Sequence, residues 1–364
     1  MTRKRDRTFL RSATLPIYLT ATLSLVYLIV LNITSRPDRE LRRNMVEASR
    51  LMVRATEAVR NCRLALGILI DPVNDPNGTG LIGLETSPIT TSLGSLEAKR
   101  TTINPNFAGL VVMLLHDAGV RKGDAVAVGA SSSFPALIIA TLSALKTIEA
   151  EARVISSLGS SEWGANIPRF NWLDMDACLR AAGVFDVRPI ALSVGGDEDI
   201  GWDMNPAGRA LIGSRLREAD IPWLEEPDLA RNVGARMQLY FAAGNGRPVK
   251  AFVNIGGSWA NIGTNAEILT LRPGLTRRLF IPGPADRGVI QAMAKAGVPV
   301  IHLLNVKGLC ERYGLPWDAR PLPEAGREGF PRRDAGSGAL PALLSVIYIG
   351  LVLAALVSGR GRFP

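Results

Sequence analysis

The chain has 364 residues, of which 47% are hydrophobic and 21% charged, and its net charge is +9. That length allows one large domain or two smaller ones with a real hydrophobic core. Most of the excess charge lies at the ends, since residues 36–334 hold 35 basic against 32 acidic side chains. A nucleic-acid-binding domain normally carries a basic stripe of its own. We therefore expect no nucleic-acid partner.

Two windows of the chain contain no charged residue, 12–35 and 335–359. Each exceeds the roughly 20 residues that cross a hydrocarbon core of about 30 Å as a helix. The sequence thus predicts two transmembrane helices, flanked by basic tails at 1–11 and 360–364. It contains no third uncharged window of this length, which argues against a multi-pass transporter. A cleaved signal peptide is the alternative for the first window. Its apolar stretch is longer than the usual h-region and no small-x-small site follows, which favours a retained anchor.

The basic residues crowded into the two short tails indicate that both ends lie in the cytoplasm and the intervening domain outside. Arginines also flank the windows on the domain side. The tails therefore exceed the domain side in the density of basic residues and not in their number. They are Arg36, Arg39, Arg42, Arg43, Arg327, Arg332 and Arg333.

Residues 38–67 are predicted to form a long helix with a heptad seam. Apolar or small residues recur in it at alternating spacings of four and three: Leu41, Met45, Ala48, Met52, Ala55, Val59, Cys62 and Leu66. Such a seam is typical of a coiled coil, which here would pair two copies of the chain through Leu41–Leu66. A stripe packed on the helix's own domain explains the same pattern.

The next segment, 71–80, is a cluster of turn-forming residues that ends the helix. Its carboxylates and amides could suggest calcium. Their spacing misses the EF-hand loop and provides no glutamate at the twelfth position, so we predict a structured turn.

Residues 68–330 are predicted to form an α/β domain with a mostly parallel open sheet and helices on both faces. Apolar strands are expected at 124–130, 154–158, 190–194, 251–255 and 298–304, and helices at 106–118, 135–146, 206–219, 226–242 and 286–296. Strands that are apolar throughout and alternate with helices are typical of this architecture.

Several of these strands run into glycine- and serine-rich turns, where open α/β sheets bind ligands. Backbone N–H groups and hydroxyls there suit a carboxylate or phosphate. The candidate anion-binding residues are Ser131, Ser132, Ser133, Gly159, Ser160, Gly195, Gly196, Asp197, Asn254, Gly256, Gly257 and Ser258, together with the basic pair Lys99 and Arg100. Glycine and serine also fill ordinary strand–helix turns, and no nucleotide-binding glycine motif is present.

Catalytic and metal alternatives are weaker. Ser132, Asp197 and His302 follow the chain order of an α/β-hydrolase triad, but the GxSxG elbow is absent. Asp197, Glu198 and Asp199 could bind Mg²⁺ or simply form a solvated loop.

The three cysteines, Cys62, Cys178 and Cys310, show no pairing pattern, so we expect unpaired thiols. Neither of the two histidines, His116 and His302, has a nearby cysteine, which argues against structural zinc. We expect no metal and no cofactor.

Eleven segments together resemble a known bacterial family. They are DPVNDPNGTGLIG (71–83), SPITT (87–91), LGSLEAKRT (93–101), NPNFA (104–108), VGAS (128–131), SFPAL (133–137), WGAN (163–166), WLDM (172–175), EEPDL (225–229), VNIGG (253–257) and HLLN (302–305). Over roughly residues 65–325 the chain resembles the poly-gamma-glutamate system protein family. The resemblance implies a membrane-anchored accessory component of poly-γ-glutamate synthesis and export in the bacterial cytoplasmic (inner) membrane. It provides no catalytic residues to transfer.

Three functions therefore stand open. The first is an accessory subunit that partners synthase or export subunits and the polyanionic product. The second is a hydrolase or transferase acting on the polymer or its γ-linked termini, and the third is a small-anion binding module. Because residues 36–334 are nearly neutral, affinity for a polyanion would have to come from local placement of amides and arginines.

Overall fold

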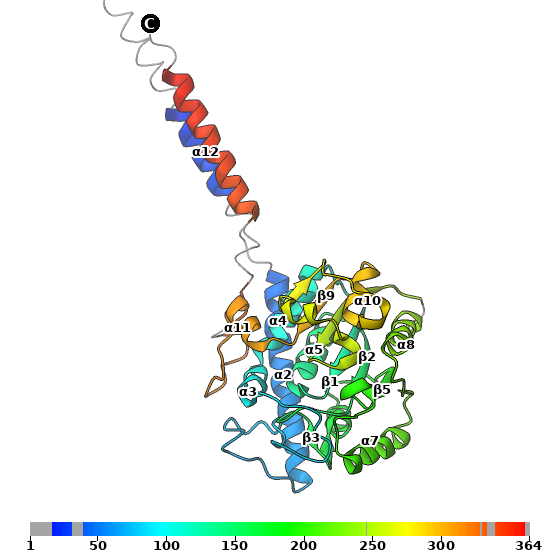
Figure 1. Ribbon diagram of the computed structural model, residues 1–364. Coiled ribbons are helices and arrows are strands. Elements are labelled where there is room, and N and C mark those ends of the chain that lie inside the picture. Colours follow the sequence, from blue (N-terminus) through cyan, green and yellow to red (C-terminus); the bar gives the residue numbers. More distant parts are fainter. Residues whose placement is uncertain (1–16, 31–38, 245, 328–329, 333–338, 361–364) are drawn as a thin grey trace, which may run out of the picture. The chain divides into compact units, whose positions relative to one another are not determined.

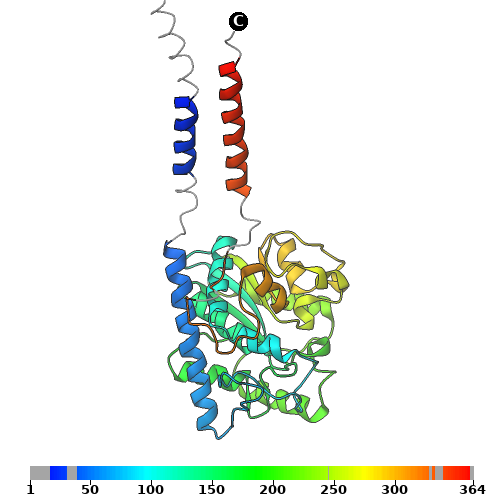
Figure 2. The same cartoon turned by 90° about the vertical axis from the view of Figure 1, so that its left-hand side faces the viewer.

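The computed structural model describes residues 17–30, 39–244, 246–327, 330–332 and 339–360 (Figures 1 and 2). The chain divides into two compact units. One comprises residues 1–39 and 333–364, and the other is the domain formed by residues 40–332.

In the first unit, the helical residues 17–30 contact the helix α12 (Ala339–Arg360). The rings of Tyr27 and Tyr348 stack with their centroids 4.3 Å apart. Hydroxyl groups join Ser24 to Tyr348 and Tyr27 to Ser345, both at 2.7 Å. Ring stacking and paired hydroxyls thus connect two segments more than 300 residues apart in sequence.

The two predicted transmembrane helices are not supported. Within the described residues, no helix combines the length and the apolar character needed to cross a membrane. Of the first window, residues 17–30 are described, and they are helical. The following predicted segments lie outside the described residues: the rest of that window, residues 335–338 of the second window, the tail at 1–11, and the tail at 360–364 apart from Arg360.

The domain is built on a seven-stranded sheet in the order β6-β5-β2-β1-β7-β9-β8. Its strands are β1 (Ala125–Ser131), β2 (Glu151–Ser157), β5 (Ala191–Ser193), β6 (Trp223–Leu224), β7 (Val249–Ile255), β8 (Gly274–Thr276) and β9 (Val300–Leu303). All neighbours pair in parallel except β8, which runs antiparallel to β9 with Gly274 opposite His302. A mostly parallel α/β sheet is therefore present, as the apolar strands predict.

The remaining elements connect or cover these strands. They are α2 (Arg39–Ala65), α3 (Leu96–Thr102), α4 (Asn106–Ala118), α5 (Pro135–Thr147), β3 (Asn166–Ile167), β4 (Phe170–Asn171), α6 (Trp172–Ala181), α7 (Pro206–Glu218), α8 (Leu229–Ala242), α9 (Trp259–Ile262), α10 (Val289–Lys295) and α11 (Val306–Tyr313), with short 3-10 helices at Asp197–Asp199, Ala266–Thr270 and Pro284–Asp286.

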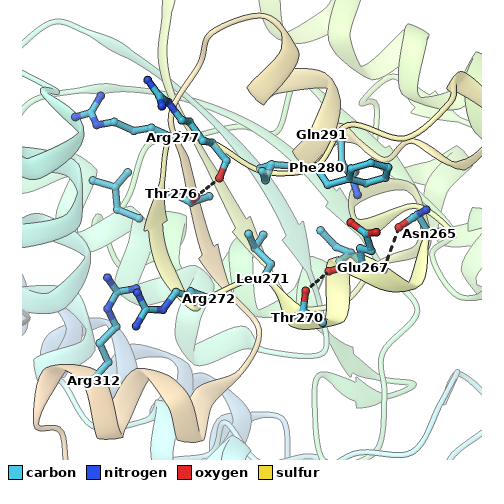
Figure 3. Close-up of a pocket in the computed structure, with 14 residues that line it drawn as sticks. Asn265, Glu267, Thr270, Leu271, Arg272, Thr276, Arg277, Phe280, Gln291 and Arg312 are labelled. Atoms are coloured by element: carbon cyan, nitrogen blue, oxygen red, sulfur yellow. Dashed lines mark hydrogen bonds between the residues drawn. The ribbon is translucent and has the colours of Figure 1, made fainter. Parts of the chain in front are cut away.

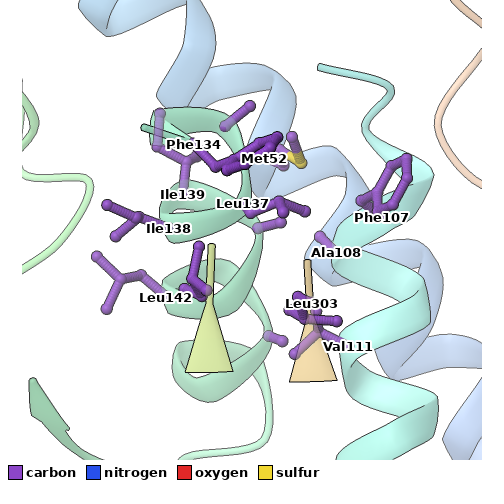
Figure 4. Close-up of a cluster of buried hydrophobic side chains, with 14 of the residues drawn as sticks. Met52, Phe107, Ala108, Val111, Phe134, Leu137, Ile138, Ile139, Leu142 and Leu303 are labelled. Carbon is purple, nitrogen blue, oxygen red and sulfur yellow. The ribbon is translucent and has the colours of Figure 1, made fainter. Parts of the chain in front are cut away.

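Both faces of the sheet are covered. Alternate residues of β1, such as Val126 and Val128, pack under α2, α4 and α5, while Ala127 packs against α8 and α10 on the opposite face. Figure 1 shows these helices on the two sides of the sheet, and Figure 4 shows the first cluster, in which Leu137 of α5 and Met52 of α2 meet. Burial on both faces explains why β1 is apolar or small at every position.

The seam of α2 packs on the chain's own domain. Six of its eight residues are buried in the larger hydrophobic cluster: Leu41, Met45, Ala48, Met52, Ala55 and Val59. Leu66, the last seam residue, follows the end of α2 and is 54% exposed. The apolar stripe thus forms intramolecular core contacts along most of its length. Figure 2 shows α2 running along the domain.

The expectation of three unpaired thiols is wrong for two of them. Cys62 of α2 and Cys178 of α6 form a disulfide, with their Cα atoms 6.1 Å apart, and Cys310 is a buried free thiol. The two bonded residues are 116 positions apart in sequence, so only the fold brings them together.

Candidate functional site

The predicted ligand-binding edge contains a topological switch point. From β1 the chain proceeds through β2, β5 and β6 on one side, then returns to β7 beside β1 and continues to β9 on the other. In open α/β sheets, ligands bind beyond the carboxyl ends of the strands at such a point. The turns after β1 and β7, with Ser131–Ser133 and Gly256–Ser258, lie there side by side: a Cβ at Gly256 would be only 2.9 Å from that of Ser131.

A row of buried polar side chains lies beneath this edge. Ser131, Ser157 and Ser193 occupy matching positions on the adjacent strands β1, β2 and β5. Ser157 Oγ, Asn254 Oδ1 and Asn261 Oδ1 are buried and have no hydrogen-bond partner among the described residues. The two asparagine oxygens only accept hydrogen bonds, whereas the Ser157 hydroxyl can also donate one. The asparagine oxygens by themselves are therefore better suited to a ligand that donates hydrogen bonds than to an anion.

The turns after β2 and β5 lie further along the same edge. Gly159 N donates to the carbonyl of Val194 at 2.6 Å, and Ser160 Oγ donates to the carbonyl of Ser132 at 3.2 Å. Gly195 and Gly196 both have positive φ, at 79° and 73°. The hydrogen bonds of Gly159 and Ser160 therefore hold neighbouring turns together.

The residues of the hydrolase-like order do not form a triad. Ser132 is fully buried and its Oγ donates to the carbonyl of Ser157 at 2.5 Å. Asn254 Nδ2 donates to His302 Nδ1 at 3.0 Å, and burial lowers the pKa of His302 to about 4. No hydrogen bond or ion pair between described residues links Ser132, Asp197 and His302.

The acidic segment after β5 is divided between surface and core. Asp199 is buried, and its carboxylate pairs with the guanidinium of Arg236 at 2.5 Å, whereas the backbone N–H of Asp197 donates to Asp203 at 2.8 Å. Among the described residues, no group of three or more histidine, cysteine, aspartate or glutamate side chains is arranged to hold a metal ion.

The basic pair on α3 points to two different places. The Arg100 guanidinium forms two 2.7 Å hydrogen bonds with the Asp318 carboxylate, which raises the pKa of Arg100. Lys99 is buried, and its Nζ donates to the carbonyl of Ser133 at 2.5 Å and to Ser161 Oγ at 2.8 Å. Lys99 thus joins the edge site, while Arg100 does not.

A separate pocket of about 600 Å³ lies beside the edge strand β8 (Figure 3). Its charged lining residues, among those described, are one glutamate, Glu267, and four arginines: Arg272, Arg277, Arg278 and Arg312. Arginine offers planar, permanently charged forks that match carboxylate groups. The pocket therefore concentrates positive charge in a domain that is nearly neutral as a whole.

Two of these guanidinium groups are held by backbone carbonyls. Arg277 Nη2 donates to the carbonyl of Asp117, and Arg312 Nη1 donates to that of Pro273, both at 2.7 Å. Arg272 and Arg278 are exposed and form no hydrogen bond or ion pair through their side chains with any described residue. Apolar groups, including Leu271 and Phe280, complete the lining.

Sequence reasoning did not identify this pocket. A local signal existed, since residues 271–280 contain three arginines and no acidic residue. The fourth arginine, Arg312, is 34 positions beyond Arg278 and joins the pocket only because β8 pairs antiparallel with β9, whose chain continues into α11.

No protein-family model, no curated protein and no solved structure matches this chain.

Proposed function

We propose that the protein is an accessory component of a bacterial poly-γ-glutamate synthesis and export system and binds the polymer through the arginine-lined pocket beside β8. One observation supports this most strongly: four arginines surround a pocket of about 600 Å³ whose lining includes a single acid. Poly-γ-glutamate bears one carboxylate on each repeat, and charge-assisted hydrogen bonds from arginine to carboxylate are among the stronger polar contacts.

The state of the arginines supports a binding role. Arg272 and Arg278 have no acidic partner among the described residues, so binding a carboxylate would not require breaking an ion pair of theirs. The carbonyl contacts of Arg277 and Arg312 orient their forks in advance, which reduces the entropy lost on binding. Apolar lining residues can pack against the methylene groups of the polymer.

The disulfide supports a location outside the cytoplasm. Disulfide bonds form and persist in oxidising compartments and are rare in the cytosol. The Cys62–Cys178 bond therefore favours a domain exposed to the cell envelope, where a polymer being exported would be met.

A titration of the full-length protein with defined-length poly-γ-glutamate tests the proposal. The control ligand is the same polymer with its carboxyls converted to methyl esters, which keeps the backbone and removes the charge. We expect saturable binding of the acid form that weakens as salt rises from 50 to 500 mM, and no binding of the ester. Equal binding of both polymers, or of neither, would refute a carboxylate-binding role.

The assembly part of the proposal has its own test. We expect the tagged full-length protein, purified from the native bacterium, to retain synthase or export subunits identified by mass spectrometry. The variant Cys62→Ala/Cys178→Ala, which lacks the disulfide, is purified in the same way. Proteins that it retains and the wild type does not are those captured non-specifically by a destabilised fold. Recovery of the same proteins from an untagged strain would remove this support.

A further inference from the structure

We propose that Ser161 and Lys99 form a nucleophile–base pair that transfers acyl groups from carboxylic esters or amides. This activity goes beyond the binding function proposed above and uses different residues at a different place in the fold. The pair lies at the carboxyl edge of the sheet, where Lys99 of α3 reaches the turns that follow β1 and β2.

The distances suit proton transfer. Lys99 Nζ lies 2.8 Å from Ser161 Oγ, within the reach required of a base and the hydroxyl it activates. The carbonyl of Ser133 accepts a second hydrogen bond from Lys99 Nζ at 2.5 Å and so orients the amine. In turn, the backbone N–H of Ser161 donates to Ser133 Oγ at 2.9 Å, which positions the nucleophile.

The surroundings of Lys99 favour an uncharged amine. Only 4% of its surface is exposed, and this burial outweighs the Phe134 ring, whose centroid lies 3.7 Å from Nζ and favours the charged form. Burial lowers the pKa of Lys99 to about 7, against the partial opposing effect of the nearby Glu162 carboxylate. A lysine with a pKa near neutrality is half unprotonated at physiological pH and can accept a proton.

The loop that carries Ser161 is held in an unusual conformation. Trp163 has φ of 62°, in the left-handed region that non-glycine residues seldom occupy, and its amide donates to the carbonyl of Leu84 at 2.8 Å. Next to it, a Cβ at Gly164 would be 2.3 Å from Ser160 Oγ. Backbone strain that the surroundings maintain in this way is concentrated at functional sites. Ser161 keeps 6% of its surface exposed, and Glu162 and Trp163 beside it are half-buried.

The reaction balances with water as the only co-reactant. Ser161 Oγ attacks the acyl carbon and passes its proton to Lys99 Nζ, which delivers it to the departing alcohol or amine as the ester or amide bond breaks. Water then attacks the acyl-serine, gives a proton to Lys99, and releases the carboxylic acid while the proton returns to Ser161 Oγ.

A fluorophosphonate probe, which phosphorylates activated serines, tests the proposal on the full-length protein. We expect one covalent adduct, mapped to Ser161 by peptide mass spectrometry, and a labelling rate that rises with pH to a plateau above about 7. Ser161→Ala should abolish labelling. Lys99→Met, which keeps the length of the side chain and removes the amine, should slow labelling at least about 100-fold.

The control is Ser214→Ala, which removes a hydroxyl whose one partner among the described residues is the carbonyl of Leu211 within α7, and it should label like the wild type. Circular dichroism establishes that each variant is folded, and the wild-type pH profile tests the role of the amine if Lys99→Met fails to fold. An unlabelled Ser161 in the folded wild-type protein, or a rate independent of pH between 5 and 9, would overturn the proposal and leave Lys99 as a clamp between the two turns. Polymer binding is measured separately, so neither result decides the other.

Discussion

The sulfur atom of Cys62 is bonded to that of Cys178, which ties the end of α2 to α6 across 116 residues of sequence. Both helices bury apolar residues in the same cluster, Val59 from α2 and Leu179 from α6 among them. The covalent bond and the apolar contacts therefore act together in holding α2 against the domain.

Removing this bond should destabilise the domain. Closing a loop of this length restricts the unfolded chain, and the chain-entropy estimate for about 100 residues is roughly 4 kcal/mol. We expect Cys178→Ala to lower the free energy of unfolding by about 2–4 kcal/mol in urea titrations. Cys310→Ala is the control, because it removes a free thiol and keeps the disulfide. Dithiothreitol should therefore lower the stability of this variant by as much as it lowers that of the wild type. An unfolding midpoint that is the same with and without reductant would contradict the bond.

Two glycines of α7 should respond in opposite directions to alanine. A Cβ at Gly208 would lie 1.7 Å from the carbonyl oxygen of Pro88, so Gly208→Ala must push α7 away from that backbone and should destabilise the domain by about 1–3 kcal/mol. At Gly213 nothing lies closer than 3.6 Å. Gly213→Ala should therefore stabilise the helix by up to about 1 kcal/mol. Thermal unfolding of both variants checks the pair, and equal shifts would show that α7 does not approach Pro88.

Burial of His302 should make the domain less stable in acid. Its pKa in the folded state is lowered to about 4, so between pH 6.5 and 4 the unfolded chain binds a proton that the folded chain does not. Stability is thus lost as pH falls through this range, by up to about 3 kcal/mol from this group. His302→Gln keeps an acceptor for Asn254 Nδ2 but does not titrate. Urea titrations at pH 7, 5.5 and 4 should show a smaller loss for the variant, and parallel curves would refute the prediction.

The central strands could be predicted because each is a short apolar run between turn residues. β1, β2, β5, β7 and β9 all overlap their predicted positions. The strands β6 and β8 were not predicted, because β6 has only two residues and β8 contains a single apolar residue, Leu275. The seam of α2 illustrates a different limit. The same apolar stripe serves a coiled coil or an intramolecular contact, and only the fold shows that Met52 is fully buried in its own domain.

The two uncharged windows misled because the absence of charge does not by itself give a helix the combination of length and apolar character that crossing a membrane requires. Hydropathy also carries no information on which cysteines form a disulfide, so the pairing of Cys62 with Cys178 could not be predicted from their positions. For the edge site, serine- and glycine-rich turns were identifiable in sequence, but the contact between Lys99 and Ser161 depends on α3 packing beside two strands. The arginine pocket depends equally on tertiary structure, since Arg278 and Arg312 belong to different elements.

Equilibrium binding of poly-γ-glutamate to Arg272→Gln/Arg278→Gln tests the central claim most directly. Both side chains line the pocket, and neither has a described partner whose loss would disturb the fold. The matched control is Arg169→Gln/Arg217→Gln, which removes two other exposed arginines and changes the net charge by the same amount. We predict that the pocket variant raises Kd about 10- to 100-fold, whereas the control raises it less than about 3-fold. Equal weakening in the two variants would contradict the account, because binding would then follow net charge and not the pocket.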